Sequence, residues 1–257
     1  MKRHVIVGIG EILWDVFPDG PRFGGAPANF ACSAAELAQD AAEVFIVSAV
    51  GDDELGQRAL GALQQHGVDT SCVRIAEQPT GQVLVTLDAA GMATYEFAED
   101  AAWDNLAWNS ALQQRAIDCD VVRFGTLGQR CTRSRDVIRR FVSTTPQTTL
   151  RILDVNLRAP FFDDEGILES LALANVLKLN DEELPRLAAL SSMTGNTVEL
   201  LQQIADRYQL QCVALTRGAD GAMIVSGDQV SDMPGQPVEV ADTVGAGDAF
   251  TCLLYTS

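Results

Sequence analysis

Residues 242–250, Asp-Thr-Val-Gly-Ala-Gly-Asp-Ala-Phe, combine small and acidic residues at a spacing that could do chemistry. Gly245, Ala246 and Gly247 let the backbone approach a ligand closely, and a helix that begins near Gly247 would point unpaired N–H groups into this turn. Asp248 would lie in the first helical turn, where a carboxylate stays ionised. The turn could then hold developing negative charge while the carboxylate accepts a hydroxyl proton, as phosphoryl transfer requires. The same pattern also describes a plain capped helix after a glycine turn.

A second stretch, residues 24–29, reads Gly-Gly-Ala-Pro-Ala-Asn. Gly24 and Gly25 predict a tight turn, and Pro27 suits the first turn of a helix that runs to about residue 38. Asn29 would lie in that first turn, on an otherwise small and apolar helix. Its amide could bind a polyol that approaches over the glycines, or it could simply be a polar residue near a helix start.

Residues 11–17 alternate between apolar and polar side chains, which favours a strand, and Asp15 stands in it among apolar and aromatic neighbours. Asp15 could bind sugar hydroxyls or could end the strand in a turn. Two further alternating runs, 82–87 and 94–97, flank residues 88–91 and predict a hairpin. We interpret these strands as a small accessory sheet.

From residue 109 onward, predicted helices alternate with apolar strands at 121–124, 151–155, 176–179 and 212–216. This rhythm predicts a parallel sheet with helices on both faces, and ligands bind such sheets beyond the carboxyl ends of the strands. Polar groups follow three of these strands: Asp154, Asn156 and Arg158; Asn180 and Glu183; Thr216, Gly218 and Gly221. Each group could be an ordinary turn or helix start, but their common place at one sheet edge favours a site.

The 257 residues suffice for one large domain, and the net charge of −17 with a pI near 4.3 disfavours nucleic acid as a partner. Six cysteines without a CxxC pair indicate buried thiols in a reducing compartment. The two histidines, His4 and His66, exclude a histidine-based triad or multi-histidine metal site. No apolar run approaches the roughly 18 residues of a membrane span. The N-terminus carries no signal-peptide pattern, so we expect a cytoplasmic protein without a membrane partner.

Four of these motifs, taken in order, resemble the ribokinase-like (PfkB) carbohydrate kinases: residues 24–29, Asp154-x-Asn156-x-Arg158, Asn180-x-x-Glu183 and residues 242–248. Residues 10–15, Gly-Glu-Ile-Leu-Trp-Asp, look most like the fructokinase branch. The resemblance covers the whole chain. It implies a single domain over residues 1–257, a three-layer α/β/α sandwich with a mostly parallel central sheet and a small β-sheet lid from about 11–23 and 80–100.

The resemblance also implies a function, ATP-dependent phosphorylation of a primary hydroxyl of a small sugar, most readily fructose. Kinases for 2-keto-3-deoxygluconate, ribose or a nucleoside are alternatives. Asp248 would be the general base, Gly245, Ala246 and Gly247 the anion hole, and Arg158 a neighbour of the transferring phosphate or the substrate. The implied sugar-binding residues are Asp15, Gly24, Gly25, Asn29, Tyr95 and Phe97. The implied nucleotide-binding residues are Asn180, Thr216, Gly218, Gly221, Gly245 and Gly247.

Asn180 and Glu183 would organise Mg²⁺ through water, and a monovalent cation near Asp242 and Thr243 is a further option. Family members continue for several dozen residues beyond the glycine motif, so the resemblance implies that a C-terminal part of the domain is missing. A sugar-binding protein without catalysis is therefore a second hypothesis. The lid sheet could also pair with that of a second subunit in a homodimer.

Overall fold

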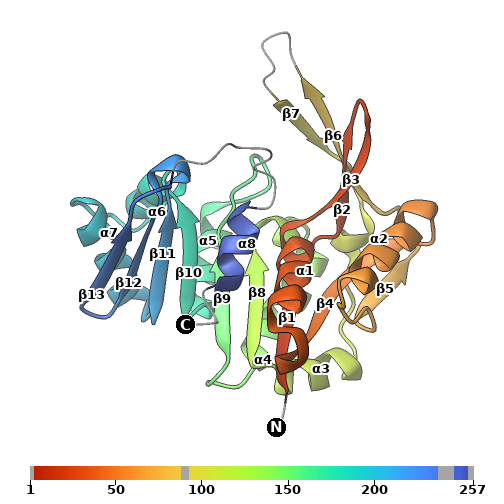
Figure 1. Cartoon of the computed structure of the whole chain (residues 1–257), viewed down its shortest axis with the longest axis horizontal. Coiled ribbons are helices and arrows are strands. Elements are labelled where there is room, and N and C mark those ends of the chain that lie inside the picture. The colour runs from red at the N-terminus through yellow and green to blue at the C-terminus, as the bar shows by residue number, and fades with distance from the viewer. Residues whose placement is uncertain (1–2, 88–92, 237–245, 254–257) are drawn as a thin grey trace.

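The computed structural model describes residues 3–87, 93–236 and 246–253, and within them nine strands form the main sheet. In spatial order this sheet reads β13, β12, β11, β10, β9, β8, β1, β4, β5 (Figure 1). The strands are β1 (His4–Ile9), β4 (Ala42–Gly51), β5 (Val73–Ala76), β8 (Val121–Gly125), β9 (Leu150–Asp154), β10 (Val176–Asn180), β11 (Cys212–Thr216), β12 (Ala222–Ser226) and β13 (Gln229–Met233).

The central strands are continuous apolar runs because both faces of the sheet are covered. β8 is buried along its whole length, and β4 is buried from Val44 to Gly51. All pairs from β11 to β5 are parallel, whereas β12 and β13 continue the sheet in antiparallel fashion. The predicted mostly parallel sheet is therefore confirmed.

Helices cover both faces and make three layers. One face carries α1 (Ala26–Ala38), α2 (Glu54–Gln65) and α8 (Ala246–Leu253), whose buried side chains belong to one apolar cluster. The other face carries α3 (Ser110–Ile117), α4 (Thr132–Thr144), α5 (Asp164–Leu173), α6 (Glu183–Leu190) and α7 (Thr197–Tyr208), which share a second cluster. Figure 1 shows α8 beside α1, and the two helices are in contact. No helix in the described part of the chain is long and apolar enough to span a bilayer.

A second sheet rises from one edge of this body and forms the lid in Figure 1. Its spatial order is β3 (Gly20–Gly24), β2 (Leu13–Phe17), β6 (Gly81–Leu87) and β7 (Ala93–Phe97). β6 and β7 pair in antiparallel fashion, which confirms the predicted hairpin, while β2 and β6 pair in parallel. Residues 88–91, predicted as the hairpin turn, lie outside the described residues.

Four strands lack a clear sequence signal. The sequence pattern indicates only turns at β3 and predicts no strand at β5, β12 or β13. β13 is exposed along its whole length, and β3 is buried only at Gly24, so neither carries a buried apolar run, and each pairs with a neighbouring strand. The cysteines are all free, but only Cys119 and Cys252 are buried, and the other four are partly exposed.

Candidate active site

Asp248 lies in the first turn of α8, at the carboxyl edge of the main sheet, and its side chain is mostly buried. Its Oδ2 accepts a hydrogen bond of 2.9 Å from Asn29 Nδ2 on α1. The helix predicted to begin near Gly247 is therefore present, and Asp248 in its first turn is bonded to the predicted sugar-binding residue Asn29. Gly245 lies outside the described residues. The backbone of Ala246 and Gly247 forms the beginning of α8.

A fully buried guanidinium stands on the other side of Asp248. Arg123 Nη2 lies 3.5 Å from Asp248 Oδ1 and donates to Asp154 Oδ2 at 2.8 Å. Lys178 Nζ donates to the other oxygen, Asp154 Oδ1, at 3.1 Å. Although burial acts to raise it, the pKa of Asp154 is lowered, because Arg123 and Lys178 both favour the carboxylate. Asp154 thus fixes two cations that face the start of α8.

The small size of Gly247 leaves room for one of these cations. A Cβ at this position would lie 3.1 Å from Lys178 Nζ. The ammonium group therefore reaches the first turn of α8, where the helix end also carries partial positive charge. A lysine and a helix N-terminus at one place suit an anionic group such as a phosphate.

Glu11 is a second buried carboxylate in this region, with 3% of its surface exposed. It follows β1 and precedes β2. Burial raises the pKa of Glu11 from 4.5 to about 7, the charge of Arg123 opposes that rise, and the charge of Asp248 adds to it. Burial also raises the pKa of Asp248, with Arg123 opposing. The two carboxylates and Arg123 are thus electrostatically coupled.

The lid presents three of the predicted sugar-binding residues on one face. Asp15 pairs with Val83, which pairs with Phe97, and Tyr95 pairs with Val85. Directly paired residues point to the same side of a sheet, so Asp15, Tyr95 and Phe97 share a face. Phe97 packs edge-on against Phe161 of the body at 5.1 Å between ring centroids.

Asp15 also connects the lid to the glycine turn and to Arg158. A Cβ on Gly24 would lie 2.7 Å from Asp15 Oδ2, so glycine at this position makes room for the carboxylate. Gly25 has φ +107° and is the N-cap of α1, a conformation that favours glycine. Burial raises the pKa of Asp15, and Arg158 opposes that rise. Arg158 itself is exposed, and its Nη1 donates to the Leu157 carbonyl oxygen at 3.1 Å, so it lies outside the Asp248–Arg123–Asp154 cluster.

On the predicted nucleotide side, Asn180 and Glu183 clamp each other. Asn180 Oδ1 accepts from the Glu183 N–H at 2.9 Å, and Glu183 Oε2 accepts from the Asn180 N–H at 2.8 Å. Glu183 Oε1 accepts from the Leu157 N–H at 2.8 Å. Both residues therefore hold the backbone of the strand ends in place. Among the described residues, no three His, Cys, Asp or Glu side chains gather as a metal site.

The remaining predicted nucleotide-binding residues follow β11. Thr216 Oγ1 lies 3.4 Å from the Leu179 carbonyl oxygen at the end of β10. Gly218 has φ +54° and faces open space, whereas a Cβ on Gly221 would lie 2.1 Å from the Met233 carbonyl oxygen. Gly218 is thus accessible to a ligand, and Gly221 is required by packing. Asp242 and Thr243, the expected monovalent-cation residues, lie outside the described residues.

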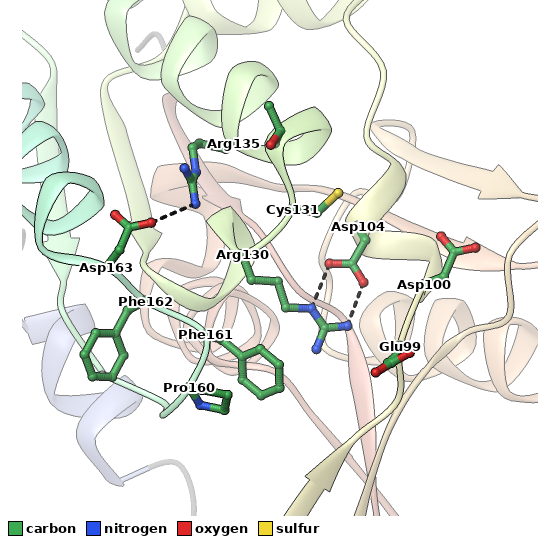
Figure 2. A pocket seen from close by; sticks show the side chains of 11 residues that line it. Glu99, Asp100, Asp104, Arg130, Cys131, Arg135, Pro160, Phe161, Phe162 and Asp163 are labelled. Carbon is green, nitrogen blue, oxygen red and sulfur yellow. Dashed lines mark hydrogen bonds and ion pairs between the residues drawn. The ribbon is translucent and has the colours of Figure 1, made fainter.

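A cavity of about 710 Å³ lies at the base of the lid, and Figure 2 shows the side chains that line it. Arg130 forms two hydrogen bonds with Asp104 there and lies over the Phe161 ring, and Arg135 pairs with Asp163. None of the described residues that line the cavity belongs to the predicted site, and its arginines already have partners. We therefore interpret the cavity as part of the junction between lid and body.

Arg123, Lys178 and Glu11 are the residues of this site that motif analysis did not assign. For Arg123 and Lys178, the available signal was a charged residue inside an apolar strand, as in Val-Val-Arg-Phe and Val-Leu-Lys-Leu. Charged side chains are rarely buried without a partner, so such positions indicate a buried ion pair. The partner could not be read from the sequence, because Asp154 lies on a third strand.

The three-layer fold, the lid and the polar groups at the carboxyl edge together define the ribokinase-like α/β class. The model of the pfkB family carbohydrate kinases matches residues 20–256, and the chain belongs to this family. It is accordingly a carbohydrate kinase.

The chain is 30% identical to a fructokinase of Klebsiella pneumoniae, over 96% of this chain and 81% of that protein. Among solved structures, it is similar to an uncharacterised sugar kinase from Pyrococcus horikoshii, with a TM-score of 0.83 and 26% identity over 98% of this chain and 83% of that one. It is also similar to a Xylella fastidiosa fructokinase with bound ATP, with a TM-score of 0.82 and 25% identity over 98% and 80% of the two chains.

Proposed function

We propose that this kinase transfers the γ-phosphoryl group of ATP to a primary hydroxyl of fructose, with Asp248 as the general base. The observation that carries the proposal is the placement of Asp248 between Asn29 and Arg123 at the start of α8. A carboxylate held from both sides keeps a fixed position, and each of its oxygens retains a lone pair for a proton.

In the proposed reaction, the sugar hydroxyl oxygen attacks the γ-phosphorus and forms the new O–P bond. Its proton passes to the Asp248 carboxylate. The bond between the γ-phosphorus and the bridging oxygen breaks, and ADP leaves with that electron pair. The backbone at Gly245, Ala246 and Gly247 is the proposed anion hole, and the Lys178 ammonium beside Gly247 supports it with a full positive charge.

The lid face that carries Asp15, Tyr95 and Phe97 is the proposed cover of the sugar, and Gly25 and Asn29 form the proposed floor. Asp15 supplies acceptors for hydroxyl groups, and Arg158 lies near enough to influence its charge. The names of the Klebsiella pneumoniae and Xylella fastidiosa fructokinases support fructose as the first substrate to test.

Nucleotide binding is proposed along the ends of β10 and β11, at Asn180, Thr216 and Gly218. The name of the ATP-bound Xylella fastidiosa fructokinase supports ATP as the donor. Mg²⁺ would neutralise phosphate charge. One carboxylate and one amide, both already bonded to backbone, suit a hydrated Mg²⁺ that arrives with the nucleotide, because this ion usually keeps several waters. Asn180 and Glu183 would hold it through water.

A panel assay tests this function. The chain is supplied with ATP, Mg²⁺ and either fructose, ribose, 2-keto-3-deoxygluconate or a nucleoside, and ADP release is measured together with the phosphorylated product. We expect fructose to give the highest kcat/KM, with the phosphate on a primary carbon. A higher value for another sugar overturns the fructose assignment. Calorimetric binding of fructose without ADP release would favour the binding protein instead.

A further inference from the structure

Five charged side chains from separate parts of the chain share the buried space beneath α8. They are the carboxylates Glu11, Asp154 and Asp248 and the cations Arg123 and Lys178. The cluster therefore holds one carboxylate more than it holds cations. Burial makes such an excess costly, and protonation of one carboxylate relieves it.

Arg123 is the centre of this cluster, and its orientation is fixed. One amino group, Nη2, donates to Asp154 and faces Asp248, while the side chain is 1% exposed. Its Nε and Nη1 are buried and have no hydrogen-bond partner in the described structure. Because the guanidinium is planar and held by Asp154, it cannot turn away from Asp248 without breaking that bond. Asp154 thus aims Arg123 at Asp248.

We propose that Arg123 is a positioning residue for the base Asp248, which it holds ionised and in place. The inference rests on the role proposed above for Asp248. Removal of the Arg123 charge would leave Lys178 as the only cation of the cluster and would favour protonated Asp248.

Glu11 takes up its proton before Asp248 as the pH falls. Burial and the charge of Asp248 raise the pKa of Glu11 to about 7, so Glu11 carries no charge where Asp248 is protonated. The other groups facing Asp248 are Asp154, which raises its pKa, and Lys178, which lowers it. The Cys252 thiol is neutral, because burial raises its pKa to about 12. Glu183 acts on this cluster through Asp154 and Lys178.

The kinetic test compares the pH dependence of kcat/KM for the wild type, Arg123→Met and Glu11→Gln. A general base must be deprotonated, so a higher pKa of Asp248 moves the acid limb of the profile to higher pH. We expect Arg123→Met to move this limb up by about 1 pH unit or more, as the loss of an adjacent opposite charge does. Glu11→Gln replaces a protonated carboxyl with a neutral amide, so it should leave the limb close to that of the wild type.

Arg123→Lys is the conservative variant and retains the charge. Its acid limb should stay close to that of the wild type even where kcat falls through altered geometry. Asp40→Asn is the matched control for Glu11→Gln, because the Asp40 side chain is fully exposed and far from the cluster in the fold. It should leave the profile unchanged. The nucleotide phosphates titrate at the same pH in every assay, so they do not contribute to differences between the variants.

A second measurement needs no catalysis. Carbon-13 NMR of the side-chain carboxyl of Asp248, assigned through Asp248→Asn, reads its pKa in the protein without substrate. It should rise in Arg123→Met and stay close to the wild-type value in Glu11→Gln. An Asp248 pKa that does not rise in Arg123→Met overturns the inference. If Arg123→Met does not fold, Arg123→Gln, which keeps a polar side chain, takes its place in both measurements. A protein inactive in the sugar panel would refute the proposed function and leave this titration interpretable.

Discussion

Burial changes the charge state that Glu11 has between about pH 4.5 and 7. Its pKa of about 7 in the folded protein, against 4.5 when unperturbed, means that the folded state binds a proton more tightly than the unfolded state. This stabilisation is complete below pH 4.5 and is lost as the pH rises through 7. The free energy of unfolding is therefore expected to decrease between pH 4.5 and 7 because of Glu11.

The corresponding prediction concerns the unfolding of Glu11→Gln. Between pH 4.5 and 7 the wild type should lose about 3 kcal/mol more unfolding free energy than the variant, because each pH unit between the unfolded and the folded pKa of Glu11 corresponds to about 1.4 kcal/mol. Urea unfolding followed at a series of pH values measures the difference. Parallel pH curves for the two proteins would contradict the burial of an ionisable Glu11.

The sequence alone identified those site residues that stand in short motifs. Asp248 and Asn29 stand in short motifs next to glycines, and both reach the site. Arg123 and Lys178 stand in apolar strands and reach the same site through Asp154, a contact that depends on strand order. Arg158 stands in a motif too, but its side chain is exposed at the loop surface.

At the scale of elements, strand register brings the polar groups together. Gly125 pairs with Asp154, Lys178 also pairs with Asp154, and Asn180 pairs with Thr216. The alternation of strands and helices predicted this parallel arrangement, because each crossover helix forces neighbouring strands to run the same way. It could not predict β12 and β13, because short connections, residues 217–221 and 227–228, replace the crossover helices and reverse the chain direction.

The junction between lid and body depends on Arg130, whose side chain is 8% exposed. It donates to both oxygens of Asp104 and to the Ala98 carbonyl oxygen just after β7. It also lies over the rings of Trp103 and Phe161. This residue therefore connects the end of the lid to the loop that follows β9.

Arg130→Met should destabilise the fold by about 3–5 kcal/mol, because it leaves Asp104 buried without its cation. Chemical denaturation measures the loss. Arg22→Met is the matched control: it breaks the exposed pair with Asp19, and it should cost less than about 1 kcal/mol. Equal losses in the two variants would show that the junction does not depend on this ion pair.

At the scale of the whole molecule, the chain is acidic, but two of its cations lie together where the phosphate donor is proposed to bind. The net charge is −17, yet Arg123 and Lys178 converge on the start of α8. The groups of the site come from residue 11 to residue 251, since Thr251 Oγ1 lies 3.4 Å from Asp154 Oδ2. The site therefore exists only when nearly the whole described chain is folded.

The most direct test of the account is single-turnover phosphoryl transfer by Asp248→Asn. The asparagine keeps the size and can still accept from Asn29, but it cannot take the hydroxyl proton. With fructose and labelled ATP, transfer should slow about 10²-fold or more, while calorimetric affinity for fructose stays within a few-fold of the wild type. Transfer at the wild-type rate would contradict the assignment of Asp248 as the base.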